Sequence, residues 1–147
     1  MPPRLRPGAV LEFAVGDGLG YVLFAGRHPA YGDAVVPATR VFPARRSPTA
    51  AEFEGSYFTF YLAQAAARAG LVSIVVSLPP PQMPTTWRRP GMIRGRTVET
   101  WLIDDDVGTR VVSQLRDSER QIPIASIWNH AMLAARVPEG WRPEHWA

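Results

Sequence analysis

Three histidines, His28, His130 and His145, are the side chains best suited to proton transfer or metal ligation near neutral pH. They form neither an HxH nor an HExxH spacing, and only His28 has a carboxylate, that of Asp33, across a short loop. One histidine and one aspartate make an incomplete metal site. The sequence therefore predicts no metal site. A small hydrolase using His28 or His130 as general base is the third of three functional hypotheses.

Two absences restrict the remaining chemistry. All sixteen lysine-plus-arginine positions are arginine, and the chain has no cysteine. This excludes disulfides, thiolate metal sites, cysteine nucleophiles, Schiff bases and a Walker lysine. No serine stands in a G-x-S-x-G sequence, and the glycine-rich residues 16–20 precede an expected strand instead of a helix. We therefore expect a protein that is not an enzyme and that carries no cofactor.

Three consecutive carboxylates, Asp104, Asp105 and Asp106, invite comparison with a calcium loop. The EF-hand pattern fails here, because its fifth position would be Gly108 and its twelfth would be Leu115 instead of glutamate. The segment is predicted to be a solvated turn between two strands.

A basic and aromatic segment follows a run of prolines. It contains Trp87, Arg88, Arg89, Arg94 and Arg96. On a small barrel such a loop can hold a phosphate backbone and stack a base, so a nucleic-acid-binding module is the second hypothesis. The alternative is that these arginines form ion pairs with Glu99, Asp104 or Asp117 and cover apolar surface with their stems. The net charge of +3 is small for a nucleic-acid-binding protein.

The elements that would position these residues are short. Apolar patterns predict strands at residues 11–15, 19–25, 34–42, 71–78, 98–103 and 109–112. Pro37 would place the third strand at an edge or at a bulge. Helices are expected over 61–69, with Gly70 after its end, and along 124–135. Together they predict an α+β fold, a curled antiparallel sheet resembling a small SH3-like barrel with two short helices.

The length of 147 residues suits a single domain, 1–147, and the prolines at 79–84 are the only plausible internal boundary. Residues 1–7 lead into no apolar leader, and the longest apolar run, 71–78, is far shorter than a bilayer span. We expect a cytoplasmic protein that does not enter a membrane.

Several segments resemble a group of small bacterial proteins that is similar to an immunity protein family of polymorphic-toxin systems. They are residues 8–13 (GAVLEF), 18–22 (GLGYV), 27–32 (RHPAYG), 58–62 (FTFYL), 101–105 (WLIDD) and 122–129 (IPIASIWN). The family usually has an acidic residue after Trp-Asn, where this chain has His130. The resemblance implies a non-enzymatic inhibitor that binds a cognate protein toxin. A basic chain would suit a toxin with an acidic surface.

The partner-binding surface is expected in loops, where polar and aromatic side chains have little structural reason to be present. The residues predicted to bind the partner are Asp17, Tyr21, Arg27, His28, Tyr31, Trp87, Arg88 and Arg89. Trp101 and Trp128 follow strand and helix patterns and are predicted to lie in the core instead.

Overall fold

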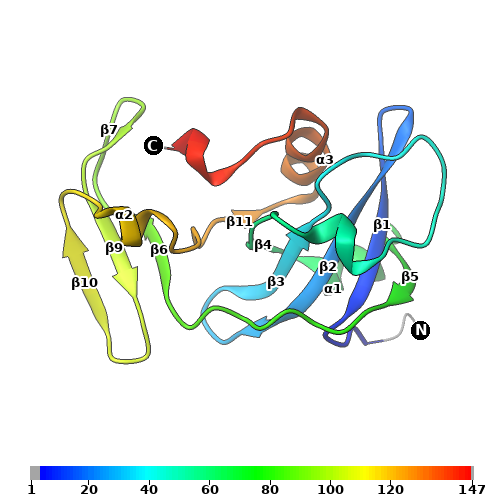
Figure 1. Ribbon diagram of the computed structural model, residues 1–147, viewed down its shortest axis with the longest axis horizontal. Helices are drawn as coiled ribbons and strands as arrows, with labels where there is room; N and C mark the ends of the chain where they lie inside the picture. Colours follow the sequence, from blue (N-terminus) through cyan, green and yellow to red (C-terminus); the bar gives the residue numbers. More distant parts are fainter. Residues whose placement is uncertain (1–3, 147) are drawn as a thin grey trace. The chain divides into compact units, whose positions relative to one another are not determined.

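The larger sheet has six strands in the order β11-β4-β3-β2-β1-β5 (Figure 1). The strands are β1 (Ala9–Val15), β2 (Gly18–His28), β3 (Gly32–Pro37), β4 (Thr59–Tyr61), β5 (Ser73–Ser77) and β11 (Ile127–Trp128). Neighbouring strands are antiparallel, except that β11 runs parallel to β4. The computed structural model describes residues 4–146.

Both faces of this sheet are covered, although the pattern in residues 11–15 predicts a strand buried on one face only. On one face, Leu11 and Phe13 belong to a core cluster that includes residues of α1 (Ala63–Arg68) and α3 (His130–Glu139). On the other face, Val10 packs in a second cluster with Phe53 of a short 3-10 helix, η1 (Ala50–Phe53). The chain between β3 and β4 thus supplies the second cover.

The end of α1 agrees with the sequence prediction, and the start of α3 does not. Gly70, at φ 75°, stands after the end of α1 in the left-handed conformation predicted for it. Helix α3 begins at His130, with Asn129 Oδ1 accepting from the Met132 amide at 2.8 Å. The predicted helix over 124–135 is wrong at its start, because Ile127 and Trp128 extend the sheet beside β4.

The third strand is shorter than predicted and lies inside the sheet. It ends at Pro37, and β4 pairs only with Ala34 and Val35, so the missing amide of Pro37 falls beyond that pairing. The expectation of an edge strand is therefore wrong. The irregularity in this region lies in β2, between Phe24 and Gly26.

A second group of strands follows the prolines. Its sheet has the order β10-β9-β6, and β7 and β8 form a separate hairpin. The bounds are β6 (Trp87–Pro90), β7 (Ile93–Arg94), β8 (Thr97–Val98), β9 (Trp101–Asp104) and β10 (Thr109–Val112), with α2 (Asp117–Arg120) and a 3-10 helix, η2 (Pro143–Trp146). The antiparallel pair β9–β10 confirms the hairpin predicted around residues 104–108.

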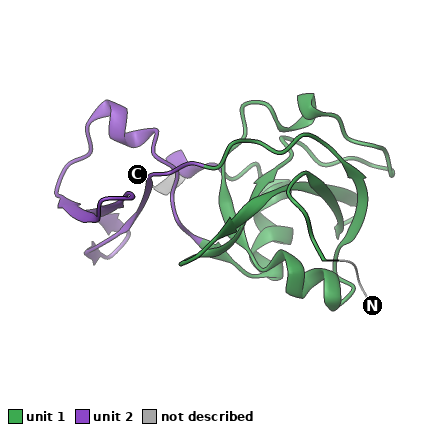
Figure 2. Cartoon of the chain, turned by 90° about the horizontal axis from the view of Figure 1, so that it is seen from below, with its two compact units in different colours: residues 1–83, 127–141 green, residues 84–126, 142–147 purple. Residues whose placement is uncertain are grey.

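The chain divides into two compact units, coloured separately in Figure 2. The first contains residues up to 83 and 127–141, and the second contains residues 84–126 and those after 141. The first division falls within the proline segment, which was predicted as the only plausible boundary, whereas the divisions after residues 126 and 141 were not predicted. The α+β class is confirmed, with three short α-helices among the described residues where two were predicted. That residues 1–147 behave as one domain stays a prediction.

An ion pair between buried Glu12 and exposed Arg45 joins β1 to the connection after β3. Glu12 is 5% exposed and accepts hydrogen bonds from Arg45, through Nη2 at 2.7 Å and Nε at 3.0 Å, and from the Tyr21 hydroxyl at 3.0 Å. Hydrogen bonding to Arg45 lowers the pKa of Glu12 below its ordinary value, with Tyr21 adding to the effect and burial opposing it. The ionised carboxylate therefore stabilises the folded state.

This pKa shift predicts the acid sensitivity of the fold. Because the pKa of Glu12 is lower in the folded than in the unfolded chain, its contribution is complete above the unfolded value and is lost as the pH falls through the folded value. Glu12→Gln should therefore lower the free energy of unfolding at about pH 7 and have a much smaller effect at an acidic pH below the folded pKa of Glu12. Urea unfolding at both pH values measures the difference.

The exposed Glu54 offers a matched control for this experiment. Glu54→Gln should leave the free energy of unfolding nearly unchanged at both pH values. An equal loss of stability in Glu12→Gln at the two pH values would show that the ionised carboxylate is not what stabilises the fold.

Candidate functional site

The loop between β2 and β3 gathers part of the predicted surface. We use the term hairpin tip for residues 27–31, which contain Arg27 and His28 at the end of β2 and Tyr31 before β3. Strand pairing continues to the pairs Arg27 with Asp33 and His28 with Gly32. Gly32, at φ 93°, reverses the chain in a conformation that other residues rarely adopt.

The His28 side chain holds the backbone of the hairpin tip. Its Nδ1 atom accepts hydrogen bonds from the amides of Ala30, at 3.0 Å, and Tyr31, at 3.2 Å. A ring nitrogen that accepts two backbone hydrogen bonds carries no proton itself. His28 is therefore a structural element of the loop, and Nδ1 is not available as a general base.

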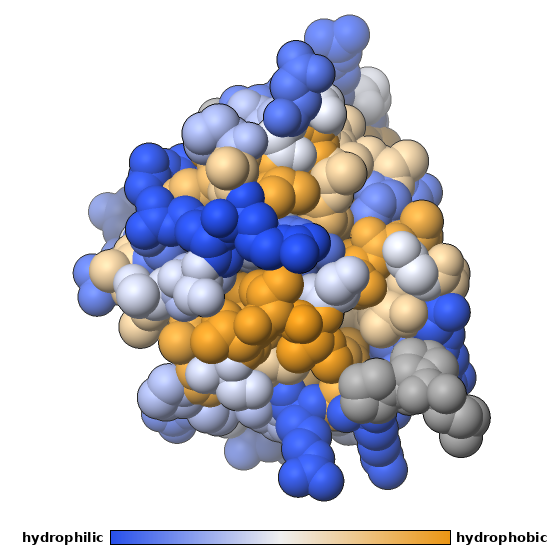
Figure 3. Space-filling view, turned by 90° about the vertical axis from the view of Figure 1, so that its right-hand side faces the viewer, coloured by the Kyte–Doolittle hydropathy of each residue, from blue (hydrophilic) through white to orange (hydrophobic). Residues whose placement is uncertain are grey.

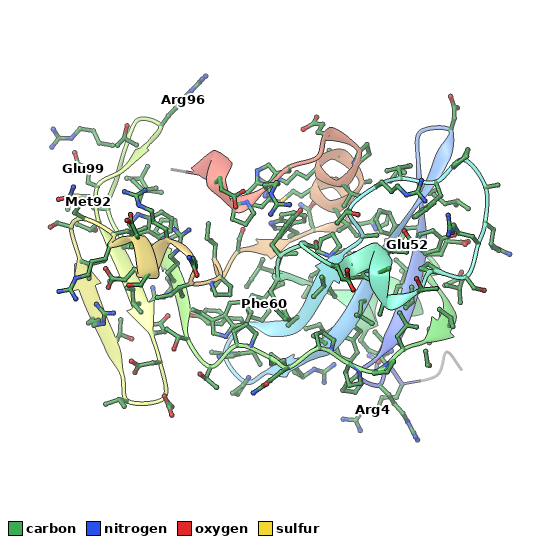
Figure 4. The ribbon with its side chains drawn as sticks, viewed as in Figure 1. Arg4, Glu52, Phe60, Met92, Arg96 and Glu99 are labelled. Atoms are coloured by element: carbon green, nitrogen blue, oxygen red, sulfur yellow. The ribbon has the colours of Figure 1, made fainter. Side chains whose placement is uncertain are left out.

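Aromatic contacts hold the hairpin tip against β4. The His28 and Tyr31 ring centroids are 4.7 Å apart. Both rings lie against Phe60 of β4, labelled in Figure 4, with centroid distances of 5.9 Å from His28 and 5.2 Å from Tyr31. Since Phe60 is completely buried, the tip rests on the core of the first unit.

The buried carboxylate of Asp33 joins the hairpin tip to α1. Asp33 is 6% exposed, and its Oδ1 accepts from Arg27 Nε at 2.9 Å. Its Oδ2 accepts from the amide of Gln64, at the start of α1, at 3.0 Å. The Gln64 side chain in turn accepts from the Leu5 amide at 2.8 Å. One carboxylate thus connects two strands, a helix and the N-terminal segment.

This arrangement is suited to contact with another molecule. The Arg27 side chain is 54% exposed, and its bond to Asp33 uses Nε, so the terminal amino groups can still bind a carboxylate of a partner. No group of three or more metal-ligating side chains occurs among the residues that could be searched. The hairpin tip presents the guanidinium of Arg27, fixed by Asp33, beside the neighbouring rings of His28 and Tyr31.

Two predicted residues of the first unit lie elsewhere. Asp17 is exposed in the β1–β2 turn, at the other end of β2 from the hairpin tip. Tyr21 is fully buried, with its hydroxyl donating to Glu12 and accepting from the Arg46 amide at 3.1 Å. Tyr21 was predicted to belong to the exposed partner surface, but it lies within β2 and packs in the second core cluster.

The predicted residues of the second unit are largely enclosed. Trp87 is 1% exposed and Arg88 is 5% exposed, so neither side chain offers a partner much surface. Arg89 Nε bonds to Asp104 Oδ2 at 2.9 Å. Trp87 and Arg88 are therefore buried in the second unit, where the sequence predicted exposed partner-binding residues. The Arg89 side chain is 40% exposed, and its place in a partner surface stays a prediction.

Ion pairs also weaken the hypothesis of a nucleic-acid surface. Arg89 is paired with Asp104, and Arg94 Nε lies 3.0 Å from Glu99 Oε1. The expected pairing of this segment with Glu99 and Asp104 is thus confirmed. Arg96 extends from the turn between β7 and β8 (Figure 4).

The acidic turn also follows its predicted form. Asp105 Oδ1 accepts from the amides of Val107, at 2.9 Å, and Gly108, at 3.0 Å, which closes the β9–β10 turn. The Asp104 carboxylate accepts hydrogen bonds from Arg89 Nε and from the Thr109 hydroxyl. The carboxylates of Asp104 and Asp105 are therefore engaged in holding the hairpin.

The other described histidine side chain is also structural. Nδ1 of His130 lies 2.7 Å from the hydroxyl of Tyr61. Burial raises the pKa of Tyr61 to about 12, so this hydroxyl stays protonated at neutral pH while it shares a hydrogen bond with His130. A phenol that is harder to ionise is a poor nucleophile. The side chain of His145 lies outside the part that the structure describes.

The strand predicted at residues 71–78 is present as β5, but its edge position and its apolar exposure were not predicted. Strand β5 lies at one end of the sheet order, with Ile74 39% exposed and Leu71, just before the strand, 47% exposed. Figure 3 looks onto the side where β5 lies in Figure 1 and shows an apolar patch bordered by hydrophilic groups. The pattern of residues 71–78 resembles a buried strand, so nothing local indicated this exposure.

Comparison with known proteins yields no relative: no protein-family model matches the chain, and no curated protein or solved structure is significantly similar to it. Among the described residues, no helix has the length and apolar character needed to cross a membrane.

The role of Asp33 can be tested by replacing one oxygen. In Asp33→Asn the amide NH₂ would face either Arg27 Nε or the Gln64 amide, donor against donor, and the charge that binds Arg27 would be lost. We expect the free energy of unfolding to fall by roughly 2 kcal/mol. Urea unfolding measures this loss, and Asp17→Asn in an exposed turn is the matched control, with an expected effect within about 0.5 kcal/mol.

NMR spectra of the same variant report on the hairpin tip itself. Amide signals of residues 28–32 should move in Asp33→Asn and stay in place in Asp17→Asn. Unchanged signals at these residues would show that Asp33 does not position the hairpin tip.

Proposed function

We propose that the chain is a non-enzymatic protein-binding module and that it acts as an immunity-type inhibitor of a bacterial toxin. The observation that supports this most directly is the fixed hairpin tip, where Arg27, His28 and Tyr31 form one surface held by Asp33 and Phe60. The histidines with described side chains serve structural hydrogen bonds, which favours binding over catalysis.

Preorganisation is the physical reason why such a surface binds well. A loop that orders only on binding loses conformational entropy at that moment, and this reduces the affinity. In the hairpin tip the backbone amides are already bonded to His28, and the Tyr31 ring already lies on Phe60. Tyrosine and arginine are also the residue types that most often dominate the binding energy of an interface.

Charge suggests the nature of the partner surface. The chain carries a net charge of +3, and Arg27 extends a guanidinium from the hairpin tip. An acidic patch on the toxin would accelerate the encounter and pair with Arg27. The proposal includes a cytoplasmic location and binding that needs neither membrane nor cofactor.

The SH3-like barrel is the finer part of the proposed fold. Six strands with both faces covered are compatible with a curled sheet of this kind. In the strand order, β11 and β5 stand at opposite ends, so closure would require these two edges to approach each other. We therefore propose that this curled sheet is related to an SH3-like barrel and that β5 remains one of its edge strands.

A growth experiment tests the proposed inhibition. The gene beside this one is expected to encode the toxin, and producing that toxin should stop growth unless the present chain is produced with it. Tyr31→Ala should weaken binding of the purified pair roughly 30-fold, because it removes a ring that is already ordered. Isothermal calorimetry measures the affinity, and the growth assay measures protection.

Arg68→Ala is the control, because Arg68 is exposed at the end of α1 on the same unit. It should bind and protect like the unaltered chain. A neighbouring gene product that is not toxic, or a toxic one that the unaltered chain neither binds nor inhibits, would overturn the proposal. If Tyr31→Ala folds correctly and binds the toxin as tightly as the unaltered chain, the hairpin tip is not the binding surface.

A further inference from the structure

The second unit encloses a cavity of about 300 Å³ that has no part in the proposed toxin binding. Its lining combines two arginines, a tryptophan, small polar groups and aliphatic side chains. The lining residues are Arg88, Val98, Trp101, Ser113, Gln114, Leu115, Arg120, Pro143 and Glu144. This volume is at the lower end of the range for small-molecule sites.

Arg88 is the most unusual residue of the lining. It is 5% exposed, and its guanidinium lies over the Trp101 ring, 4.2 Å from the centroid. Nε donates to the Ile122 carbonyl at 2.8 Å, and Nη2 donates to the Arg120 carbonyl at 3.3 Å. These bonds use one edge of the guanidinium and hold it against the ring.

The other edge of this guanidinium has no counter-charge of its own. Among the described residues, Arg88 forms no ion pair and uses two of the five N–H groups that an arginine side chain carries. Burial lowers the pKa of Arg88, and the charge of Arg120 lowers it further, while Glu144 acts in the opposite direction. A buried cation without an anion is costly, and a bound anion would remove that cost.

The remaining lining fits an anion with an apolar body. Arg120 supplies a second cation, with its Nε 4.0 Å from Asp117 in a loose, exposed pair. Leu115, Val98 and the Trp101 ring provide apolar walls. Glu144 is the one carboxylate of the lining, and it is paired with Arg142 at 3.2 Å, so it competes only weakly for Arg88.

We propose that this cavity binds a small organic acid. The carboxylate would meet the unused edge of the Arg88 guanidinium and the side chain of Arg120, and the apolar body would lie against Trp101 and Leu115. A planar carboxylate matches the planar arginine fork through two parallel hydrogen bonds. The cavity volume limits the body to about the size of one ring or one short branched chain.

NMR titration of the full chain with benzoate tests this site. Benzoate should cause saturable shifts of the Trp101 indole signal and of the amides of residues 113–115, with a dissociation constant of about 5 mM or lower for so small a ligand. Benzamide, which has the same shape without the charge, should bind at least about tenfold more weakly. Absence of saturable shifts, or equal binding of benzamide, would overturn the proposal.

Variants at the rim of the cavity avoid unfolding the unit, since Arg88 itself holds two backbone carbonyls. Arg120→Gln should weaken benzoate binding several-fold by removing the second cation. Glu144→Gln should strengthen it by removing a repulsive charge. Benzoate affinities that change in neither variant would contradict the assignment. Inorganic phosphate binding as tightly as benzoate would contradict the apolar half of the site.

Discussion

The position of the hairpin tip depends on the carboxylate of Asp33. A carboxylate that is 6% exposed must be satisfied by hydrogen bonds, and its donors are Arg27 Nε and the amide that begins α1. Because those donors belong to different elements, Asp33 ties β2 and β3 to the start of α1 at one point. The aromatic support from Phe60 then fixes the rings of His28 and Tyr31 on the same side. The proposed binding surface therefore depends on the buried carboxylate of Asp33 together with the aromatic support of Phe60.

The use of arginine alone as the long-chain cation has different consequences in the two units. Arg27 and Arg45 each direct a planar fork at a buried carboxylate, Asp33 or Glu12. Arg88 is instead buried against Trp101 with two backbone carbonyls as acceptors. A lysine could not combine stacking with that pattern of hydrogen bonds. The first kind of contact stabilises the fold, and the second leaves a cation facing a cavity.

Local features were predictable from the sequence, and contacts between distant segments were not. The pairing around residues 104–108 and the left-handed Gly70 follow from short patterns. The strand at Ile127–Trp128 forms only because Phe60 and Tyr61 lie beside it, which no local pattern reveals. In the site, Arg27, His28 and Tyr31 come together because one turn joins them. The burial of Tyr21 depends on Phe42 and Phe53, and the position of Arg88 depends on the Ile122 carbonyl, all of which are far away in the sequence.

Hydrogen–deuterium exchange of the chain, alone and mixed with the proposed protein partner, shows most directly whether the hairpin tip is the contact surface. If the hairpin tip is the contact surface, complex formation should slow exchange in residues 27–32 and in the strand that follows. Exchange that slows only along residues 71–77, at the exposed β5 edge, or only in the second unit would contradict that expectation.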